Sequence, residues 1–138
     1  MYPEAFVAPM RKELSDVGIL ELHTPEEVVK ALDDKSGTLL LVVNSVCGCA
    51  AGGARPGVIS ALNLPTRPDR IVSVFAGVDK EATQKAREYL MPFPPSSPAI
   101  ALFKDGQLVH ILERHHIERS TVQMITENLI AAFEKHCR

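Results

Sequence analysis

The sequence lacks two features that would place it in a specialised class of protein. No apolar run approaches the roughly 20 residues needed to cross a bilayer. No block of basic residues is present either, because 15 Lys and Arg stand against 17 Asp and Glu, for a formal net charge of −2. Binding along a phosphate backbone usually needs a basic excess. We therefore expect neither a membrane nor a nucleic acid as a partner.

Cysteine is scarce, and a secretory signal is missing. The three cysteines, Cys47, Cys49 and Cys137, cannot all pair within one chain, which argues against a framework of structural disulfides. The opening MYPEAFVAPMRKEL is interrupted by Pro3, Pro9 and charged residues, unlike a secretory signal. We expect a cytoplasmic protein, in which cysteines are usually metal ligands, redox-active groups or buried thiols.

The composition that remains is typical of one globular domain. Apolar residues make up 46% and charged residues 23% of the 138 residues, enough to bury a core without disulfides. We predict a single domain over residues 1–138, whose first helix carries Phe6, Met10, Leu14 and Val17 on one face. The apolar spacing predicts helices at about 6–17, 25–35, 50–62, 80–90 and 121–136, and strands at 19–22, 38–44, 71–76, 99–104 and 107–113.

Capping signals fix the start of several helices. Thr24 and Glu27 form the pattern of a capping box around a helix N-terminus, and Ser120 with Gln123 repeats it before the last helix. Asp79 is placed to cap the helix that follows it. These signals predict where three of the helices begin.

The order of elements predicts the architecture. Residues 38–44, TLLLVVN, are continuously apolar, which indicates a strand buried on both faces. Asp105 and Gly106 are a two-residue hairpin signal between the last two strands. The order α-β-α-β-α-β-α-β-β-α therefore combines a parallel core with an antiparallel hairpin. We predict a three-layer α/β/α sandwich with a mixed sheet.

The stretch VNSVCGCAAGG places Cys47 and Cys49 between a strand and a helix, at the sheet edge where α/β proteins bind ligands. The start of a helix stabilises a thiolate, and Arg55 would add to the same positive field. Gly48 tolerates the small ring that a bond between the two cysteines would close, and such a strained disulfide is easily reduced. We expect Cys47 to attack and Cys49 to resolve.

Two other interpretations of the cysteine pair stay open. Both thiols could simply line a buried turn, since free cysteine is often buried. A metal site is less favoured, because zinc usually needs about four ligands and the other candidates show no matching spacing; these are His110, His115, His116, His136 and Cys137.

A second feature is the Ser97–Pro98 pair that opens a predicted strand. In a domain with cysteines at another strand end, Pro98 could be a cis-proline beside the redox site. The alternative is an ordinary proline at the start of a strand.

The cysteine motif, the proline before a strand and the hairpin, SSPAIALFKDG, together resemble the thioredoxin superfamily. More narrowly, the segments VVNSVCGCAAG, ARP, VFAG-DKEAT, PSSP, RH-IE and the closing HC resemble the bacilliredoxin family over nearly the whole chain.

This resemblance implies a thioredoxin-like thiol-disulfide oxidoreductase that removes bacillithiol from proteins carrying it as a mixed disulfide. Cys47 would take bacillithiol from the client protein, and Cys49 or a free bacillithiol would regenerate it. Pro98 matches the cis-proline of the superfamily. The implied partners are bacillithiolated clients and the low-molecular-weight thiol itself, which acts as a co-substrate with no bound cofactor and no metal.

Bacillithiol carries carboxylates, so we assign substrate binding to Gly48, Arg55 and Ser97 around the helix N-terminus. Arg114 and His115 would join them only if the loop after the last strand folds towards Cys47, and we favour a solvated surface pair. The rival functions are a general disulfide isomerase, a soft-metal carrier using the two cysteines, and a redox-inert adaptor. The sequence assigns no role to His116 or Cys137 and no oligomeric state.

Overall fold

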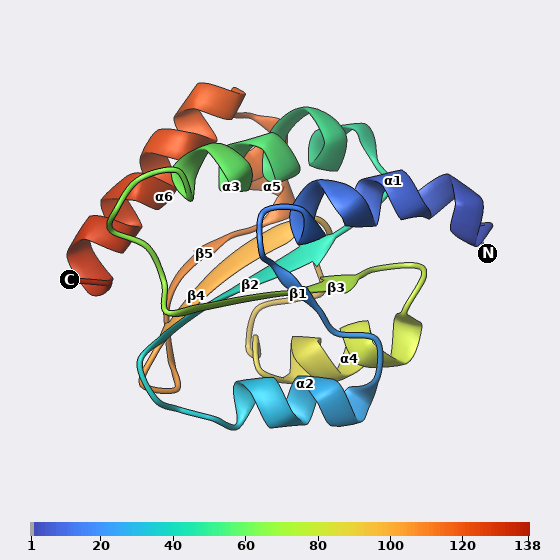
Figure 1. The fold of residues 1–138 in the computed structure, drawn as a ribbon, viewed down its shortest axis with the longest axis horizontal. Coiled ribbons are helices and arrows are strands. Elements are labelled where there is room, and N and C mark those ends of the chain that lie inside the picture. Colours follow the sequence, from blue (N-terminus) through green and yellow to red (C-terminus); the bar gives the residue numbers. More distant parts are fainter. Residues whose placement is uncertain (1) are drawn as a thin grey trace.

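A computed structural model describes residues 2–138 and shows a mixed sheet between two layers of helices (Figure 1). The five strands lie in the order β1-β3-β2-β4-β5. Pairing is parallel for β1 with β3 and for β3 with β2, and antiparallel for β2 with β4 and for β4 with β5. The strands are β1 (Leu20–Glu21), β2 (Thr38–Asn44), β3 (Arg70–Phe75), β4 (Ala99–Lys104) and β5 (Gln107–Leu112).

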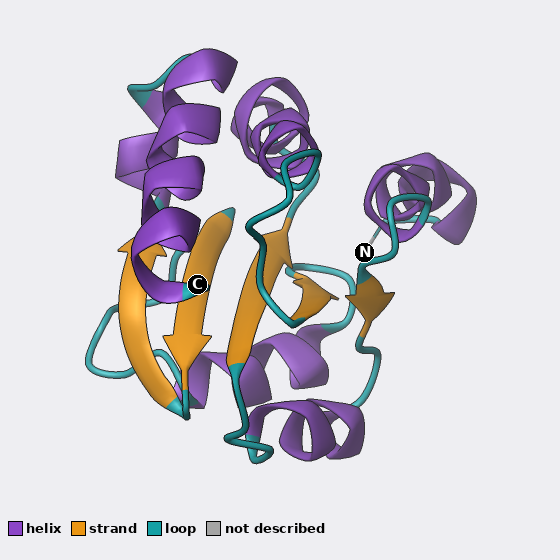
Figure 2. Cartoon of the chain, turned by 60° about the vertical axis from the view of Figure 1, so that its left-hand side comes forward, coloured by secondary structure: helices purple, strands orange, loops and turns teal. Residues whose placement is uncertain are grey.

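Helices cover both faces of the sheet, as Figure 2 shows from the side. One core cluster joins one face of the sheet to α1, α3, α5 and α6, and the other joins the opposite face to α2 and α4. The predicted three-layer α/β architecture is confirmed. The helices are α1 (Glu4–Ser15), α2 (Pro25–Leu32), the π-helical turn η1 (Ala50–Ala54), α3 (Arg55–Ala61), α4 (Lys80–Glu88), α5 (Arg114–Glu118) and α6 (Val122–His136).

Strand β2 is the centre of the molecule. All seven of its residues are buried. Leu40 and Val42 belong to the cluster under α3 and α6, whereas Leu39, Leu41 and Val43 belong to the cluster under α2 and α4. Because both faces of the strand are covered, the segment needs apolar side chains at every position rather than at alternate ones.

Two of the predicted local signals are formed. The Thr24 hydroxyl accepts from the Glu27 N–H, and the Glu27 carboxylate accepts from the Thr24 N–H, so the capping box at α2 is confirmed. Asp105 and Gly106 have φ values of 50° and 82°, the left-handed backbone of a tight hairpin turn between β4 and β5.

The two other predicted side chains make no capping hydrogen bond, although Asp79 does occupy the N-cap position of α4. At α6 the N-cap is Thr121, which accepts from the Met124 N–H at 3.1 Å, while the Ser120 hydroxyl donates to the carbonyl of His116. Asp79 does precede α4, but its carboxylate accepts from Arg11 at 2.8 Å instead of capping the helix. In each case the side chain forms its hydrogen bond with a group outside the helix end: Ser120 with the His116 carbonyl, and Asp79 with Arg11.

The N-terminal segment also differs from the prediction. The inward face of α1 carries Val7 and Leu14, while Phe6 is 51% exposed. Strand β1 has only two residues, and α5, which the spacing of apolar residues did not indicate, follows β5. Among the described residues, no helix is long and apolar enough to cross a membrane.

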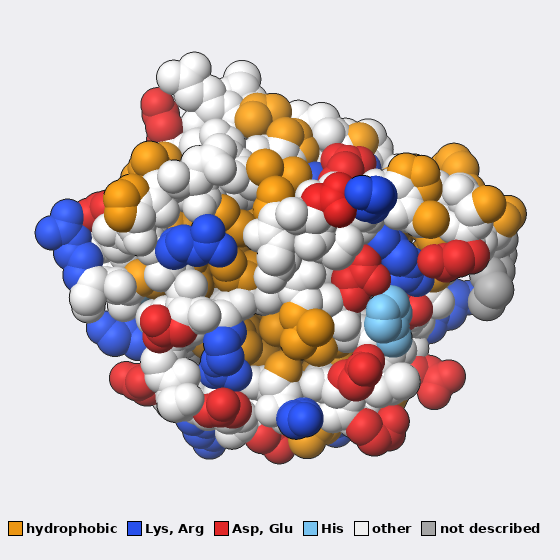
Figure 3. All heavy atoms as spheres, viewed as in Figure 1, with side chains coloured by type: hydrophobic (Ala, Val, Ile, Leu, Met, Phe, Trp, Pro, Cys, Tyr) orange, Lys and Arg blue, Asp and Glu red, His pale blue; other side chains and the backbone are white. Residues whose placement is uncertain are grey.

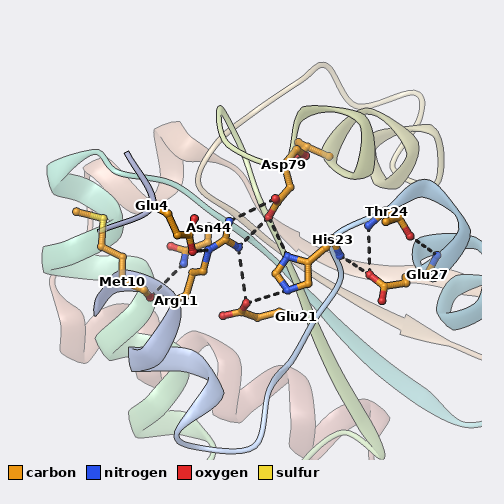
Figure 4. A network of polar contacts seen from close by, with 10 residues as sticks. Glu4, Met10, Arg11, Glu21, His23, Thr24, Glu27, Asn44 and Asp79 are labelled. Carbon is orange, nitrogen blue, oxygen red and sulfur yellow. Dashed lines mark hydrogen bonds and ion pairs between the residues drawn. The ribbon is translucent and has the colours of Figure 1, made fainter. Parts of the chain in front are cut away.

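Helix α1 is tied to the sheet by a network of charges (Figure 4). The Arg11 guanidinium donates to Asp79 at 2.8 Å and lies 3.6 Å from Glu21. His23 lies between the same two carboxylates, 3.2 Å from Glu21 and 3.5 Å from Asp79. Beyond this network, acidic and basic side chains are interspersed over the face seen in Figure 3.

Candidate active site

The two cysteines lie where β2 passes into a helix, as predicted. After Asn44 the chain makes a short loop, and helical structure begins at Gly48. The N–H groups of Ala50 and Ala51 both donate to the carbonyl of Cys47, at 3.1 and 3.2 Å. Cys47 is therefore at the start of a continuous helical segment that runs through η1 and α3 to Ala61.

The first part of this segment is a π-helical turn that the sequence did not predict. The turn η1 brings Gly53 against α5 and α6, because a Cβ at Gly53 would lie 3.3 Å from both Ile117 and Ile125. Turns of this kind often occur at functional sites in helices. The only local hint is the pair Gly52 and Gly53 in the run AAGGA, since glycine weakens a regular helix whereas the flanking alanines favour one.

The two thiols are free and lie in contact. The Sγ atoms of Cys47 and Cys49 are 2.8 Å apart, and both side chains are partly buried. The Ser45 hydroxyl donates to Cys47 Sγ at 3.1 Å, and the Cys47 N–H donates to the Ser45 oxygen. Ser45 was not singled out from the sequence, although its place between strand and motif could have indicated it.

Hydrogen bonding makes the pair unequal. Burial acts to raise the pKa of Cys47, but hydrogen bonds from the Cys49 thiol, the Ser45 hydroxyl and the N–H groups of Ala50 and Cys49 outweigh it and lower that pKa. The pKa of Cys49 is raised by burial, by its hydrogen bond to Cys47 and by the charge on Cys47. Cys47 is thus the thiol that ionises first, with Cys49 donating to it.

Arg55 lies inside the protein and not at the surface. Its side chain is 1% exposed, and Nη1 donates to Asn44 Oδ1 at 2.9 Å and to the Ser45 carbonyl at 2.8 Å. Nε lies 3.2 Å from Glu13 Oε1, an ion pair whose angle is unsuitable for a hydrogen bond. This burial does not support the substrate contact expected of Arg55. The guanidinium instead braces the loop that carries Ser45 and Cys47.

The proline that opens β4 lies beside the cysteine loop. The Ser97–Pro98 bond is cis, as predicted. Val43 pairs with Ala99 across the antiparallel strands β2 and β4, so Pro98 lies next to Asn44 at the end of β2. Ser97 directs its carbonyl to Arg114, which donates to it through Nη1 at 3.2 Å.

Arg114 and His115 are both exposed at the surface, as expected of a solvated pair. Both line a cavity of about 430 Å³ between α5 and the segment before β4, together with Pro94, Pro95, Ser96, Ser97, Glu113 and Glu118. A larger cavity of about 540 Å³ lies between α2 and the β1 edge, and no cysteine lines it. No cysteine lines the smaller cavity either, but the charge of Arg114, which does line it, acts to lower the pKa of Cys49, so this cavity is close to the thiol pair.

The remaining histidine and cysteine candidates lie apart from the thiol pair. His116 accepts from the Glu113 N–H at 2.9 Å, and its ring contacts that of His115 at a tilt of 44°. Cys137 is half-buried against the core, and burial raises the pKa of its thiol. Within residues 2–138, no group of three or more His, Cys, Asp or Glu side chains is arranged to hold a metal ion.

The fold is that of thioredoxin. The structure resembles the oxidised mitochondrial thioredoxin 3 of Saccharomyces cerevisiae, with a TM-score of 0.59 and 16% sequence identity, covering 89% of this chain and 98% of that one. The paired thiols at the end of the central strand place the chain among thioredoxin-fold proteins built for thiol-disulfide exchange.

Sequence comparison is more specific. A family model described as "Disulphide isomerase" matches residues 2–137. The bacilliredoxin of Cytophaga hutchinsonii is 57% identical over 135 residues, which covers 98% of this chain and 99% of the relative. The bacilliredoxin of Salinibacter ruber is 54% identical over 138 residues, covering 99% and 81%. The chain belongs to the bacilliredoxin family and is a thiol-disulfide oxidoreductase.

Proposed function

We propose that this oxidoreductase removes bacillithiol from client proteins that carry it as a mixed disulfide. The observation that carries the proposal is the inequality of the thiol pair: Cys47 accepts hydrogen bonds from Cys49 and Ser45, and its pKa is lowered while that of Cys49 is raised. In such a pair, the thiolate can attack a mixed disulfide and take up the small thiol, and the protonated thiol can later displace it.

In the first step the Cys47 thiolate attacks the bacillithiol sulfur of the mixed disulfide. A bond forms between Cys47 and bacillithiol, the original disulfide breaks, and the client leaves as a thiolate that takes a proton. The negative charge on Cys47 is lost in this step. Two of the causes that raise the pKa of Cys49, its hydrogen bond to Cys47 and the negative charge on Cys47, are lost with it.

In the second step a thiolate displaces bacillithiol from Cys47. If Cys49 attacks, bacillithiol leaves as a thiolate and a Cys47–Cys49 disulfide forms, which an external dithiol or thiol must then reduce. If a free bacillithiol attacks, the products are bacillithiol disulfide and the regenerated Cys47 thiolate. Free bacillithiol is thus a product of the first route and a co-substrate in the second. That the protein acts in the cytoplasm, where stable disulfides are rare, stays a prediction.

The test is to trap the first intermediate. A Cys49→Ala variant incubated with a bacillithiol-capped client should gain one bacillithiol on Cys47, detected by mass, while a Cys47→Ala variant should gain none. Absence of any adduct on Cys49→Ala, with the client still capped, would contradict the proposal.

A general disulfide isomerase is the second candidate, favoured by the description of the matching family model. It predicts that the protein reshuffles a scrambled disulfide substrate as fast as it removes bacillithiol. Parallel rate measurements on the two substrates separate the functions.

A further inference from the structure

The cavity beside the thiols has the construction of a small-molecule site. Its volume of about 430 Å³ is within the range of small-ligand pockets, roughly 300–1,000 Å³. One wall is the segment that leads to the cis Ser97–Pro98 bond, and the other is α5. Because α5 also packs on η1 through Ile117, the cavity is connected to the turn that follows the cysteines.

Arg114, a half-exposed residue that lines this cavity, is held by hydrogen bonds. Its N–H donates to the Ser96 hydroxyl at 2.7 Å, and its guanidinium donates to the Ser97 carbonyl. The pKa of Arg114 is raised, first by its hydrogen bond to Glu118 and next by the charges of Cys49 and Cys47. The last two causes mean that the guanidinium is close enough to act on the thiol pair.

Arg114 also has a bond that a ligand can replace. Its partner Glu118 is four residues along the same short helix, and both side chains are about half exposed. An exposed pair of this kind contributes little to stability. A ligand carboxylate can bind the guanidinium fork in its place with two parallel hydrogen bonds.

We propose that this cavity binds the body of the low-molecular-weight thiol, with Arg114 contacting a carboxylate while the sulfur of the ligand lies against Cys47. The inference rests on the proposed function and adds the recognition site to it. Glu113 and Glu118 leave the cavity with acidic groups as well, which suits the ammonium of a cysteine-derived thiol. The ligand class is therefore a small thiol that carries both a carboxylate and an amine.

Binding at this site would decide which sulfur of a mixed disulfide is attacked. With the small thiol in the cavity, Cys47 meets the bacillithiol sulfur, and the client leaves. Without it, Cys47 can attack either sulfur. Attack on the client sulfur gives a disulfide between Cys47 and the client and releases free bacillithiol. In both reactions one disulfide is exchanged for another, and no external oxidant is needed.

The experiment compares Arg114→Ala with Arg119→Ala, an exposed arginine at the end of the same helix that does not line the cavity. Both changes are made in the Cys49→Ala background, so that adducts on Cys47 accumulate. One client is capped either with bacillithiol or with 2-mercaptoethanol, which has no charge. Rates of uncapping and masses of the adducts are measured.

We expect Arg114→Ala to slow reaction with the bacillithiol-capped client by about tenfold or more, the effect of one charged hydrogen bond. Reaction with the 2-mercaptoethanol cap should change less than about twofold on the same argument. The adduct on Cys47 should shift from bacillithiol towards the client. Arg119→Ala should match the parent on both caps.

Equal slowing on both caps would overturn the inference, since Arg114 would then act only on the thiolate. An unchanged rate and adduct would also overturn it. If the parent protein removes the bacillithiol cap throughout, these results leave the proposed function standing; if it never does, the proposed function fails first.

Discussion

Individual side chains around the end of β2 determine which of the two thiols ionises. Cys47 receives hydrogen bonds from both Ser45 and Cys49, whereas Cys49 has a thiolate for a neighbour. The helix start contributes the N–H groups of Ala50 and Cys49 to the same sulfur. The pKa values of the two sulfurs therefore move in opposite directions although the residues are separated only by Gly48.

Arg55 holds the residues on which this arrangement depends. Its guanidinium joins Asn44, the Ser45 carbonyl and Glu13 from a position closed to solvent. Removing a buried charge partner leaves these groups unpaired, and such changes are among the most destabilising single substitutions.

An Arg55→Met variant should therefore lose stability, by about 2–4 kcal/mol in the free energy of unfolding. We expect a loss below the upper end of the range for buried ion pairs, because Glu13 is partly exposed. Urea denaturation of this variant beside Arg119→Met, an exposed arginine, measures it. A loss below about 0.5 kcal/mol, the size of an ordinary surface change, would show that Arg55 does not brace the loop.

At the scale of the elements, the site depends on how closely α3 approaches α6. A Cβ at Gly57 would lie 2.5 Å from Ile125 Cγ2 and 3.0 Å from its Cβ, and neither atom is the free end of a flexible chain. Gly57 lowers the helix propensity of the segment, but it allows the two helices to pack in contact.

We expect Gly57→Ala to lower the free energy of unfolding by about 1–3 kcal/mol, the usual cost of overpacking. Gly52→Ala is the matched control, because a Cβ at Gly52 meets nothing within 4 Å. Thermal unfolding followed by circular dichroism compares the two. Equal melting temperatures for Gly57→Ala and the parent protein would contradict the close approach.

The elements that could be predicted are those whose signals are local. The continuously apolar β2, the Thr24 capping box and the Asp105–Gly106 turn need only neighbouring residues, and all three are formed. Helix α5 and the π-helical turn could not be predicted, since five residues carry too little periodicity. The Asp79 cap failed because Arg11, 68 residues away, binds that carboxylate.

At the scale of the whole molecule, the site is assembled from three segments that are distant in sequence. The β2–η1 loop brings the thiols, the start of β4 brings Pro98, and α5 brings Arg114. The cysteine motif and the cis-proline could be located from the sequence, because each lies at a recognisable strand end. The burial of Arg55 and the position of Arg114 at the cavity could not, because only the packed structure determines which arginine is buried and which lines the cavity.

The framework around these segments is held from both ends of the chain. Arg11 fixes α1 to Glu21 and Asp79, and α6 packs along α3. The Arg55–Glu13 pair joins α1 to the start of α3. The N-terminal helix and the core thus both support the loop that carries Cys47, and this support holds the two thiols in contact.

The most direct test is to alkylate the reduced protein with iodoacetamide across a series of pH values and to locate the label by mass spectrometry. Only the thiolate reacts, so labelling reports ionisation at each cysteine. The account predicts that Cys47 is labelled first, with a midpoint below the ordinary thiol value of 9.0, and Cys49 only at higher pH. Labelling of Cys49 before Cys47, or of both together only above that value, would contradict it.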